Sequence, residues 1–160
     1  MPVTIHIDLL ADHPDSVMRL GHWMHAQWPT PGRSVADRAG LFMQCMNRDR
    51  VPMTLVAMDG KQLAGTVSLL DRSVATHEHL HPWVASLYVA QDRRHAGLAT
   101  RLVEAAVAAA RRLQLNAVYI GIASAARAHY ELHDWCYIGA GHVADDPVDR
   151  VDVLRRSLLP

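Results

Sequence analysis

The stretch that decides the fold is Arg94-His95-Ala96-Gly97-Leu98-Ala99. It follows an apolar run over residues 82–90 that is typical of a buried strand, and it leads into an alanine-rich run over residues 100–110 that is typical of a helix. A strand, a tight turn of small residues and a helix start bring several backbone N–H groups without helical partners to one point. Together with the positive end of the helix dipole, these groups suit a phosphate or pyrophosphate. The sequence therefore predicts an anion site at this turn.

Gly97 has a direct physical reason to be glycine. Glycine takes left-handed backbone dihedrals at low cost, and a side chain here would hold phosphate oxygens away from the backbone. Ala99 and Thr100 are also small, and Arg93 and Arg94 add positive charge. Two common phosphate loops are excluded, because the chain contains neither Gly-x-Gly-x-x-Gly nor Gly-x-x-x-x-Gly-Lys-Ser/Thr. On the hexamer alone, an ordinary strand-to-helix turn with a solvated arginine pair stays open.

Length and composition bound the class of protein. The chain has 160 residues, half of them apolar, which predicts one globular domain with a sizeable core. No apolar run reaches the roughly 18 residues that span a membrane, and residues 1–4 do not resemble the start of a signal peptide. A net charge of zero argues against a nucleic-acid partner. Cys45 and Cys136 are too few for a disulfide framework, so we expect two buried free thiols and a cytoplasmic location.

Hydrophobic periodicity predicts an α/β chain with a mixed sheet in one layer, flanked by helices. Strand-like patterns cover residues 3–7, 53–58, 62–70, 82–90, 116–122, 135–140 and 150–154. A first helix should begin within residues 12–15 and end near Trp28, with Trp28 on its buried face. Further helices are expected over residues 35–48, 98–113 and 124–132, with Ser34 and Ser124 as N-caps. Asp59-Gly60 predicts a hairpin, and Asp145-Asp146-Pro147 a turn.

Residues 89–99 resemble motif A of the GNAT superfamily of N-acetyltransferases, which use acetyl-CoA. In that motif a strand is followed by Gln/Arg-x-x-Gly-x-Gly/Ala and then by a helix. Arg94, Gly97 and Ala99 fall on the three defined positions. The resemblance covers residues 50–140 well and the first fifty loosely. It implies one N-acetyltransferase domain over residues 1–160, with a mixed, mostly antiparallel sheet of about seven strands and about four helices.

A second segment, residues 128–135, resembles the family's Tyr-x-x-x-Gly-Phe segment. Tyr130 falls on the tyrosine, Asp134 replaces the glycine and Trp135 replaces the phenylalanine. The resemblance implies that Tyr130 donates a proton to the coenzyme A thiolate as an amine displaces it. A packed tyrosine with a merely structural hydroxyl stays open as the alternative. Asp134 should take the left-handed backbone that the family's glycine adopts, since Asp tolerates it better than most residues.

The resemblance also implies how the cofactor is held. Its extended pantetheine arm should pair with the main chain of residues 87–89, where a backbone N–H would also polarise the thioester carbonyl. The diphosphate should bind the turn. The cofactor-binding residues expected are Leu87, Tyr88, Val89, Arg94, His95, Ala96, Gly97, Leu98, Ala99, Thr100 and Ser124. Ser124 stands next to the place of a family asparagine, and a role as a simple N-cap is its alternative.

An attacking amine must be neutral, so we expect a general base, direct or through water. The candidates are His22, His25, His77, Glu78, His79 and His81. The same histidines suggest a rival reading as a zinc site, although no His-Glu-x-x-His or Cys-x-x-Cys is present and we assign no metal. In the family, the first two helices wall the acceptor pocket, and here they carry Trp23 and Trp28.

The leading prediction is an acetyl-CoA-dependent N-acetyltransferase that moves an acetyl group to a primary amine by direct attack on the thioester. A non-catalytic acyl-CoA-binding module is the second reading, and a histidine-cluster metal protein the third. The acceptor is expected to be a small-molecule or peptide amine, with no membrane or nucleic-acid partner. Sparse acidic residues around the acceptor wall argue against a polycationic aminoglycoside. Family members often dimerise, which leaves a homodimer open.

Overall fold

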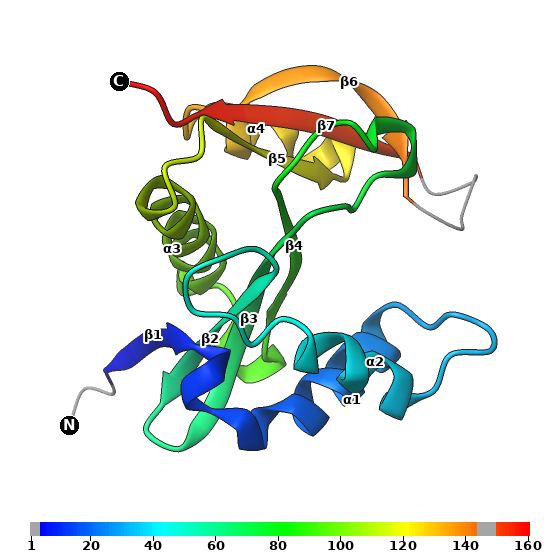
Figure 1. Cartoon of the computed structure of the whole chain (residues 1–160), viewed down its shortest axis with the longest axis vertical. Coiled ribbons are helices and arrows are strands. Elements are labelled where there is room, and N and C mark those ends of the chain that lie inside the picture. Colours follow the sequence, from blue (N-terminus) through cyan, green and yellow to red (C-terminus); the bar gives the residue numbers. More distant parts are fainter. Residues whose placement is uncertain (1–3, 144–149) are drawn as a thin grey trace. The chain divides into compact units, whose positions relative to one another are not determined.

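Figure 1 shows a computed structural model of the chain, which describes residues 4–143 and 150–160. Seven strands form one sheet in the order β1-β2-β3-β4-β5-β7-β6. The strands are β1 (Ile5–Leu9), β2 (Met53–Asp59), β3 (Gln62–Leu70), β4 (Trp83–Val89), β5 (Ala117–Ile122), β6 (Cys136–His142) and β7 (Arg150–Ser157). The α-helices of the described residues are α1 (Val17–Gln27), α2 (Val35–Met43), α3 (Leu98–Arg112) and α4 (Arg127–Glu131).

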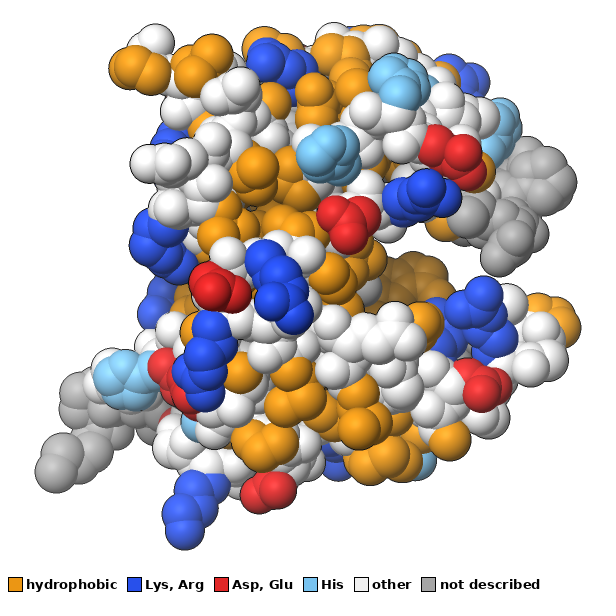
Figure 2. Space-filling model, in the orientation of Figure 1, with side chains coloured by type: hydrophobic (Ala, Val, Ile, Leu, Met, Phe, Trp, Pro, Cys, Tyr) orange, Lys and Arg blue, Asp and Glu red, His pale blue; other side chains and the backbone are white. Residues whose placement is uncertain are grey.

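The ladders confirm the predicted mixed, mostly antiparallel sheet. β1 pairs antiparallel with β2, and β7 pairs antiparallel with both β5 and β6, whereas β4 and β5 run parallel. The chain forms two compact units, of which the first comprises residues 1–68 and 86–106 and the second residues 69–85 and 107–160. On the face drawn in Figure 2, Lys and Arg side chains are interspersed with Asp and Glu side chains. No helix among the described residues is long and apolar enough to cross a membrane.

The first unit is built around the helices α1 and α2. Its core comprises Leu10, Val17, Leu20, Trp23, Met24, Ala39, Phe42, Val56 and Met58. The predicted first helix begins later than expected, because two short 3₁₀ turns, Leu10–Asp12 and Pro14–Ser16, precede α1. Trp28 lies just past the end of α1 and is 43% exposed, so the prediction that it is buried is wrong.

Ser34 caps α2 as predicted. Its side chain accepts a hydrogen bond from the Asp37 N–H, and the Asp37 carboxylate accepts one from the Ser34 N–H, which forms a capping box and lowers the pKa of Asp37. The helix ends at Met43 rather than near residue 48. The Cys45 N–H donates to the Phe42 carbonyl three residues back, so the last turn tightens and the helix stops.

The hairpin between β2 and β3 and the helix α3 follow the prediction closely. Gly60 has a φ of +60°, as a tight hairpin requires. The inner face of α3 buries Leu98, Leu102, Ala106 and Ala110. A Cβ on Gly65 of β3 would lie 2.9 Å from both the Leu102 side chain and the Tyr88 carbonyl oxygen. This glycine therefore lets β4 and the start of α3 approach β3 closely, and these two elements carry the candidate site.

Strand β4 contains a break that the sequence did not predict. Ser86 has a φ of +53°, in the left-handed region, in the middle of the strand. Among the described residues, the ladder between β4 and β5 covers only Trp83 and Val84. Residues 87–89, the second half of β4, follow the break and lie outside that ladder.

In the second unit, Val74, Trp83 and Val153 form a core cluster. Two expectations are wrong here. Cys45 of the first unit is buried as expected, but Cys136 is exposed, because it begins β6 at the end of the sheet order. Ser124 does not cap a helix with its side chain; it starts a 3₁₀ turn, Ser124–Ala126, and α4 follows at Arg127. The predicted turn at residues 145–147 lies outside the described residues.

Candidate active site

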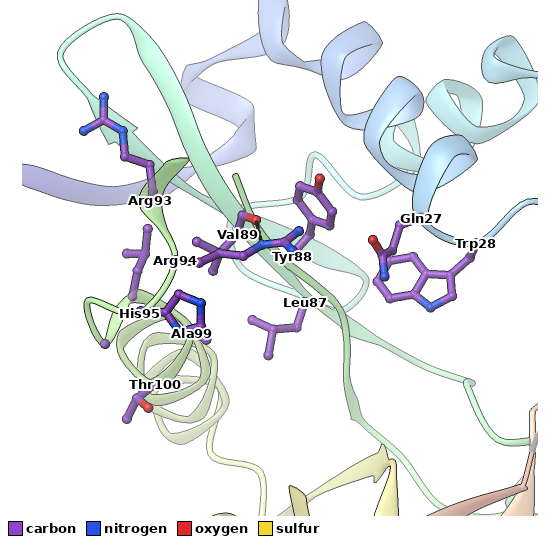
Figure 3. Close-up of a pocket in the computed structure, with 12 residues that line it drawn as sticks. Gln27, Trp28, Leu87, Tyr88, Val89, Arg93, Arg94, His95, Ala99 and Thr100 are labelled. Atoms are coloured by element: carbon purple, nitrogen blue, oxygen red, sulfur yellow. Dashed lines mark hydrogen bonds between the residues drawn. The ribbon is translucent and has the colours of Figure 1, made fainter. Parts of the chain in front are cut away.

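A pocket of about 450 Å³ lies within the first unit, a size that is typical of a small-molecule site. Figure 3 shows its lining side chains coming from the end of α1, from the second half of β4 and from the turn that begins α3. The lining residues are Gln27, Trp28, Leu87, Tyr88, Val89, Arg93, Arg94, His95, Gly97, Leu98, Ala99 and Thr100. The structure therefore gathers nine of the eleven predicted cofactor-binding residues around one cavity, and adds Gln27, Trp28 and Arg93.

The turn before α3 is shaped by two left-handed residues. Gly97 has a φ of +79°, as expected of a glycine chosen for its backbone. A Cβ added there would have no heavy atom within 4 Å. Packing therefore does not explain this glycine, whereas its left-handed backbone does, and the space beside it is open. His95 also adopts a positive φ, of +65°, which the sequence did not indicate, although His is among the residues enriched in that region.

The start of α3 presents backbone donors at this open turn. The Arg101 N–H donates to the Gly97 carbonyl over 3.1 Å, which is the first hydrogen bond of the helix. The N–H groups of Leu98 and Ala99 precede that bond, so the helix itself gives them no partner. The positive end of the helix dipole lies at the same place. These donors and the space beside Gly97 fit a phosphate group.

The two arginines of the turn contact different parts of the first unit. The Arg93 guanidinium forms an ion pair with Asp59 and donates to the Gln62 side chain over 3.3 Å. Figure 3 shows the Arg93 side chain directed away from His95. Because of the ion pair with Asp59, the charge of Arg93 is largely compensated at the β2–β3 hairpin. Arg94 lies along β4 instead. Its Nε donates to the Val89 carbonyl over 3.0 Å, and its guanidinium carbon lies 5.3 Å from the centre of the Tyr88 ring.

The other end of the pocket is aromatic. The rings of Trp23 and Tyr88 have centroids 4.8 Å apart, which ties α1 to β4. Gln27 and Trp28, at the end of α1, complete this wall. In Figure 3 they lie across Tyr88 and Leu87 from the turn. The family resemblance predicts Trp28 in the acceptor wall, whereas the helical periodicity wrongly predicts that its side chain is buried.

Two predicted cofactor residues are not among those that line the pocket. Ala96 belongs to the turn, between the two left-handed residues, but it does not line the cavity. Ser124 lies in the second unit, where it is exposed on a 3₁₀ turn.

Tyr130 lies on α4 in the second unit. Its ring meets the Trp135 ring edge-on, with centroids 6.1 Å apart, and its carbonyl accepts a hydrogen bond from the Trp135 N–H. Trp135 is 2% exposed. Asp134 adopts a φ of +68°, so the expected left-handed turn is present without glycine. Burial raises the pKa of the Tyr130 phenol, which therefore stays protonated at neutral pH.

Arg127 connects the same short helix to strands of the second unit. Its Nε donates to Glu131 over 2.7 Å, and its guanidinium lies 3.7 Å from the centre of the Tyr137 ring on β6. Its Nη1 lies 3.7 Å from a carboxylate oxygen of the buried Asp152 on β7. Glu131 first and the other acidic neighbours after it raise the pKa of Arg127. These contacts fix the helix that carries Tyr130.

The histidines that suggested a zinc site all lie among the described residues. Within residues 4–143 and 150–160, no group of three or more His, Cys, Asp or Glu residues is placed to hold a metal ion. The rings of His77 and His79 stack 6.2 Å apart, and the Thr76 hydroxyl lies 2.9 Å from Nδ1 of His77. The Nδ1 atom of His25 is buried with no partner among the described residues. None of these observations selects a general base.

Comparisons with known proteins agree with this geometry. The model of the acetyltransferase (GNAT) family matches residues 17–134, which is more than half of the chain. A search of curated proteins found no match in sequence.

Solved structures share the fold over nearly the whole chain. An aminoglycoside 6'-N-acetyltransferase complexed with coenzyme A has a TM-score of 0.73 at 17% identity, covering 97% of this chain and 98% of its own. The structure of yncA from Salmonella typhimurium with its cofactor acetyl-CoA has a TM-score of 0.67 at 16% identity, with coverages of 98% and 95%. Ard1 from Thermoplasma volcanium has a TM-score of 0.69 at 12% identity, with coverages of 99% and 100%.

At these identities the likeness of the solved structures speaks for the fold alone. The match of the family model shows membership of the family. It spans both the turn around Gly97 and the segment around Tyr130. The chain therefore belongs to the GNAT family of acetyltransferases, whose cosubstrate is acetyl-CoA.

Proposed function

We propose that this protein is an acetyl-CoA-dependent N-acetyltransferase, formed by a single domain over residues 1–160, that acetylates a primary amine. The observation that carries the proposal is the open, left-handed turn at Gly97, at the start of α3 and at one end of a pocket. A turn of this kind presents backbone donors to a diphosphate. Membership of the GNAT family supports the same cosubstrate.

The main chain would hold the coenzyme. The N–H groups of Leu98 and Ala99 would bind the diphosphate, and residues 87–89 of β4, outside the ladder with β5, would pair with the amides of pantetheine. When bound, acetyl-CoA supplies an activated acyl group as a thioester. Gln27 and Trp28 line the pocket at the end away from the turn, where the acyl end of the extended coenzyme would lie.

Tyr130 is the proton donor in this proposal. A tyrosine phenol is protonated at neutral pH, which is the form that a donor needs, and burial raises the pKa of Tyr130 further in that direction. Trp135 packs against its ring, and Arg127 ties its helix to β6 and β7, so the phenol is held on a fixed support. The general base stays unassigned.

The acceptor is proposed to be a small-molecule or peptide amine without several positive charges. The lining of the pocket contains no carboxylate, and Gln27 and Trp28, at the end away from the turn, are uncharged. A polycationic acceptor would gain no attraction from such a wall. The sparse, free cysteines are compatible with a reducing cytoplasm, where acetyl-CoA is available.

Two measurements test the proposal. Calorimetry should show acetyl-CoA binding, and a panel of primary amines should yield at least one acceptor that releases free coenzyme A, followed with a thiol reagent. No affinity at millimolar acetyl-CoA would overturn the cofactor assignment. Tight binding with no turnover on any amine would favour the alternative, a non-catalytic acyl-CoA-binding module.

A further inference from the structure

The connection between α1 and α2 carries Trp28, the tryptophan whose side chain is most exposed. It is 43% exposed, whereas Trp23, Trp83 and Trp135 are 9%, 0% and 2% exposed. Trp28 is the C-cap of α1, and its N–H donates to the Met24 carbonyl over 2.9 Å. The backbone at Trp28 is therefore tied to the helix, but the residues that follow it leave the helix. The position of the Trp28 indole in the pocket therefore depends on which contacts fix the start of the connection between α1 and α2.

Arg38 of α2 contacts the start of this connection. Its Nη2 donates to the Trp28 carbonyl over 2.5 Å and to the Thr30 hydroxyl over 2.6 Å. The Thr30 hydroxyl in turn donates weakly to the same Trp28 carbonyl, over 3.4 Å. One guanidinium group thus joins the first and third residues of the connection to the neighbouring helix.

The helix that supplies Arg38 is a firm base. A Cβ on Gly21 of α1 would lie 2.9 Å from the Val35 carbonyl and 3.0 Å from the Ala39 nitrogen, so α1 and α2 touch through their backbones. The capping box at Ser34 fixes the start of α2. Arg38 therefore acts from a part of the first unit that has little room to shift.

The chemistry of the contact explains why arginine suits the place. The Trp28 carbonyl is among the last acceptors of α1, where a cation interacts favourably with the negative end of the helix dipole. The Arg38 Nε is buried and has no partner among the described residues, so the side chain's polar contacts are concentrated at Nη2. A charge-assisted hydrogen bond of this kind is stronger than a neutral one.

We propose that Arg38 is a positioning residue that fixes the Trp28 indole as the wall of the pocket facing Leu87 and Tyr88. Its kinetic consequence rests on the proposed function, because the wall lies at the end of the pocket away from the turn that would bind the diphosphate. Arg38 itself does not line the pocket and is not a catalytic residue. Its removal should therefore disturb the acyl and acceptor end more than the binding of the coenzyme.

The test compares Arg38→Met, Arg38→Lys and the control Arg48→Met. Arg48 is an exposed arginine of the same unit whose ion pair with Asp12 lies outside the pocket. Acrylamide quenching of fluorescence, corrected with Trp28→Phe versions of each protein, reports the Trp28 indole without any ligand. We expect Arg38→Met to change the Trp28 quenching constant about twofold, Arg38→Lys to restore much of it, and Arg48→Met to leave it unchanged.

The kinetic arm uses an acceptor found in the amine panel. Arg38→Met should raise the KM for the acceptor about tenfold, while the calorimetric Kd for acetyl-CoA stays within about twofold. Unchanged quenching in Arg38→Met overturns the proposal, and so does an equal loss of acceptor and acetyl-CoA affinity. If wild-type protein does not bind acetyl-CoA, the proposed function fails, whereas the quenching comparison still decides whether Arg38 positions Trp28.

Discussion

Two left-handed turns of this molecule have similar backbones and opposite surroundings. At Gly97, in the first unit, the space where a Cβ would lie is empty to 4 Å, and a pocket adjoins it. At Asp134, in the second unit, the next residue is Trp135, which is 2% exposed and packs on the Tyr130 ring. The main chain of the first turn faces open space, whereas the second turn is followed by the buried Trp135 side chain, which packs against the Tyr130 ring.

The difference teaches how each kind of site is built. An open turn needs a small residue and a helix start, and both are local in sequence. A supported side chain needs partners from several strands, here Tyr137 of β6 and Asp152 of β7 through Arg127. A similar φ therefore accompanies an open main chain in one place and a packed side chain in the other. Variants at the two turns should therefore differ in their effects on ligand binding and on turnover.

The largest expected effect is on the supported side chain. Tyr130→Phe should lower kcat by about 10²-fold, because the proton donor is lost while the ring and its packing remain. The calorimetric Kd for acetyl-CoA should not change. Tyr137→Phe is the matched control in the same unit, since it keeps the ring beneath Arg127 and should leave kcat unchanged. Equal activity of the Tyr130→Phe and wild-type proteins would remove the catalytic role.

A substitution in the open turn at Gly97 should instead change the affinity for acetyl-CoA. Gly97→Ala should weaken acetyl-CoA affinity at least about tenfold, because a left-handed alanine costs about 1–2 kcal/mol and its methyl group enters the space of the ligand. Gly60→Ala provides the control, since Gly60 also has a positive φ and open space around it but lies at the hairpin. Both variants should lose similar stability in chemical unfolding. If their acetyl-CoA affinities were also alike, the turn would not be the diphosphate site.

The pH dependence sharpens the role of Tyr130. Burial raises its pKa above the ordinary value of about 10, so folding favours the protonated phenol. The stabilisation from this group is complete below pH of about 10 and is lost as the pH rises through the folded-state pKa. Urea unfolding between pH 8 and 11, compared with Tyr130→Phe, should show a loss in the wild type that the variant lacks. A steeper loss in the variant would contradict the assignment.

The smallest effect concerns Asp134 itself. Asp134→Gly relieves the left-handed strain but gives the unfolded chain more freedom, so the free energy of unfolding should rise by only about 0.5 kcal/mol. Because the turn keeps its shape, kcat should be unchanged. Thermal unfolding and steady-state kinetics measure the two quantities. A large fall in kcat would mean that the carboxylate, and not only the turn, supports Tyr130.

Much of the fold was readable from local patterns. The range of β3 and the start of α3 matched the prediction, because alternation, the Asp59-Gly60 hairpin and the buried face of α3 are properties of single segments. The cap at Ser34 was equally local. The predicted end of α2 was wrong, because no residue pattern within the helix indicates that its last turn tightens at Cys45.

The candidate site was predictable where the main chain forms it. Gly97 is predicted from the residues themselves, because small residues between a strand and a helix signal a backbone site, whereas residues 87–89 are predicted from the resemblance to the GNAT family. The ion pair of Arg93 with Asp59 joins two segments that are separated in the sequence, and so does the hydrogen bond from Arg38 to the Trp28 carbonyl. Local patterns therefore do not predict either contact. The left-handed Ser86 had no signal, because serine is an ordinary strand residue.

A recognition surface made of peptide groups has a consequence for how such a sequence can drift. At the turn before α3, positions 95 and 97 accept few residue types because both have a positive φ, whereas many amino acids should be tolerated at position 96, which does not line the pocket. Mutations can accumulate around a fixed chemical function as long as the chain's path survives. That tolerance is one physical reason why proteins at 12–17% identity retain this architecture over nearly their full length.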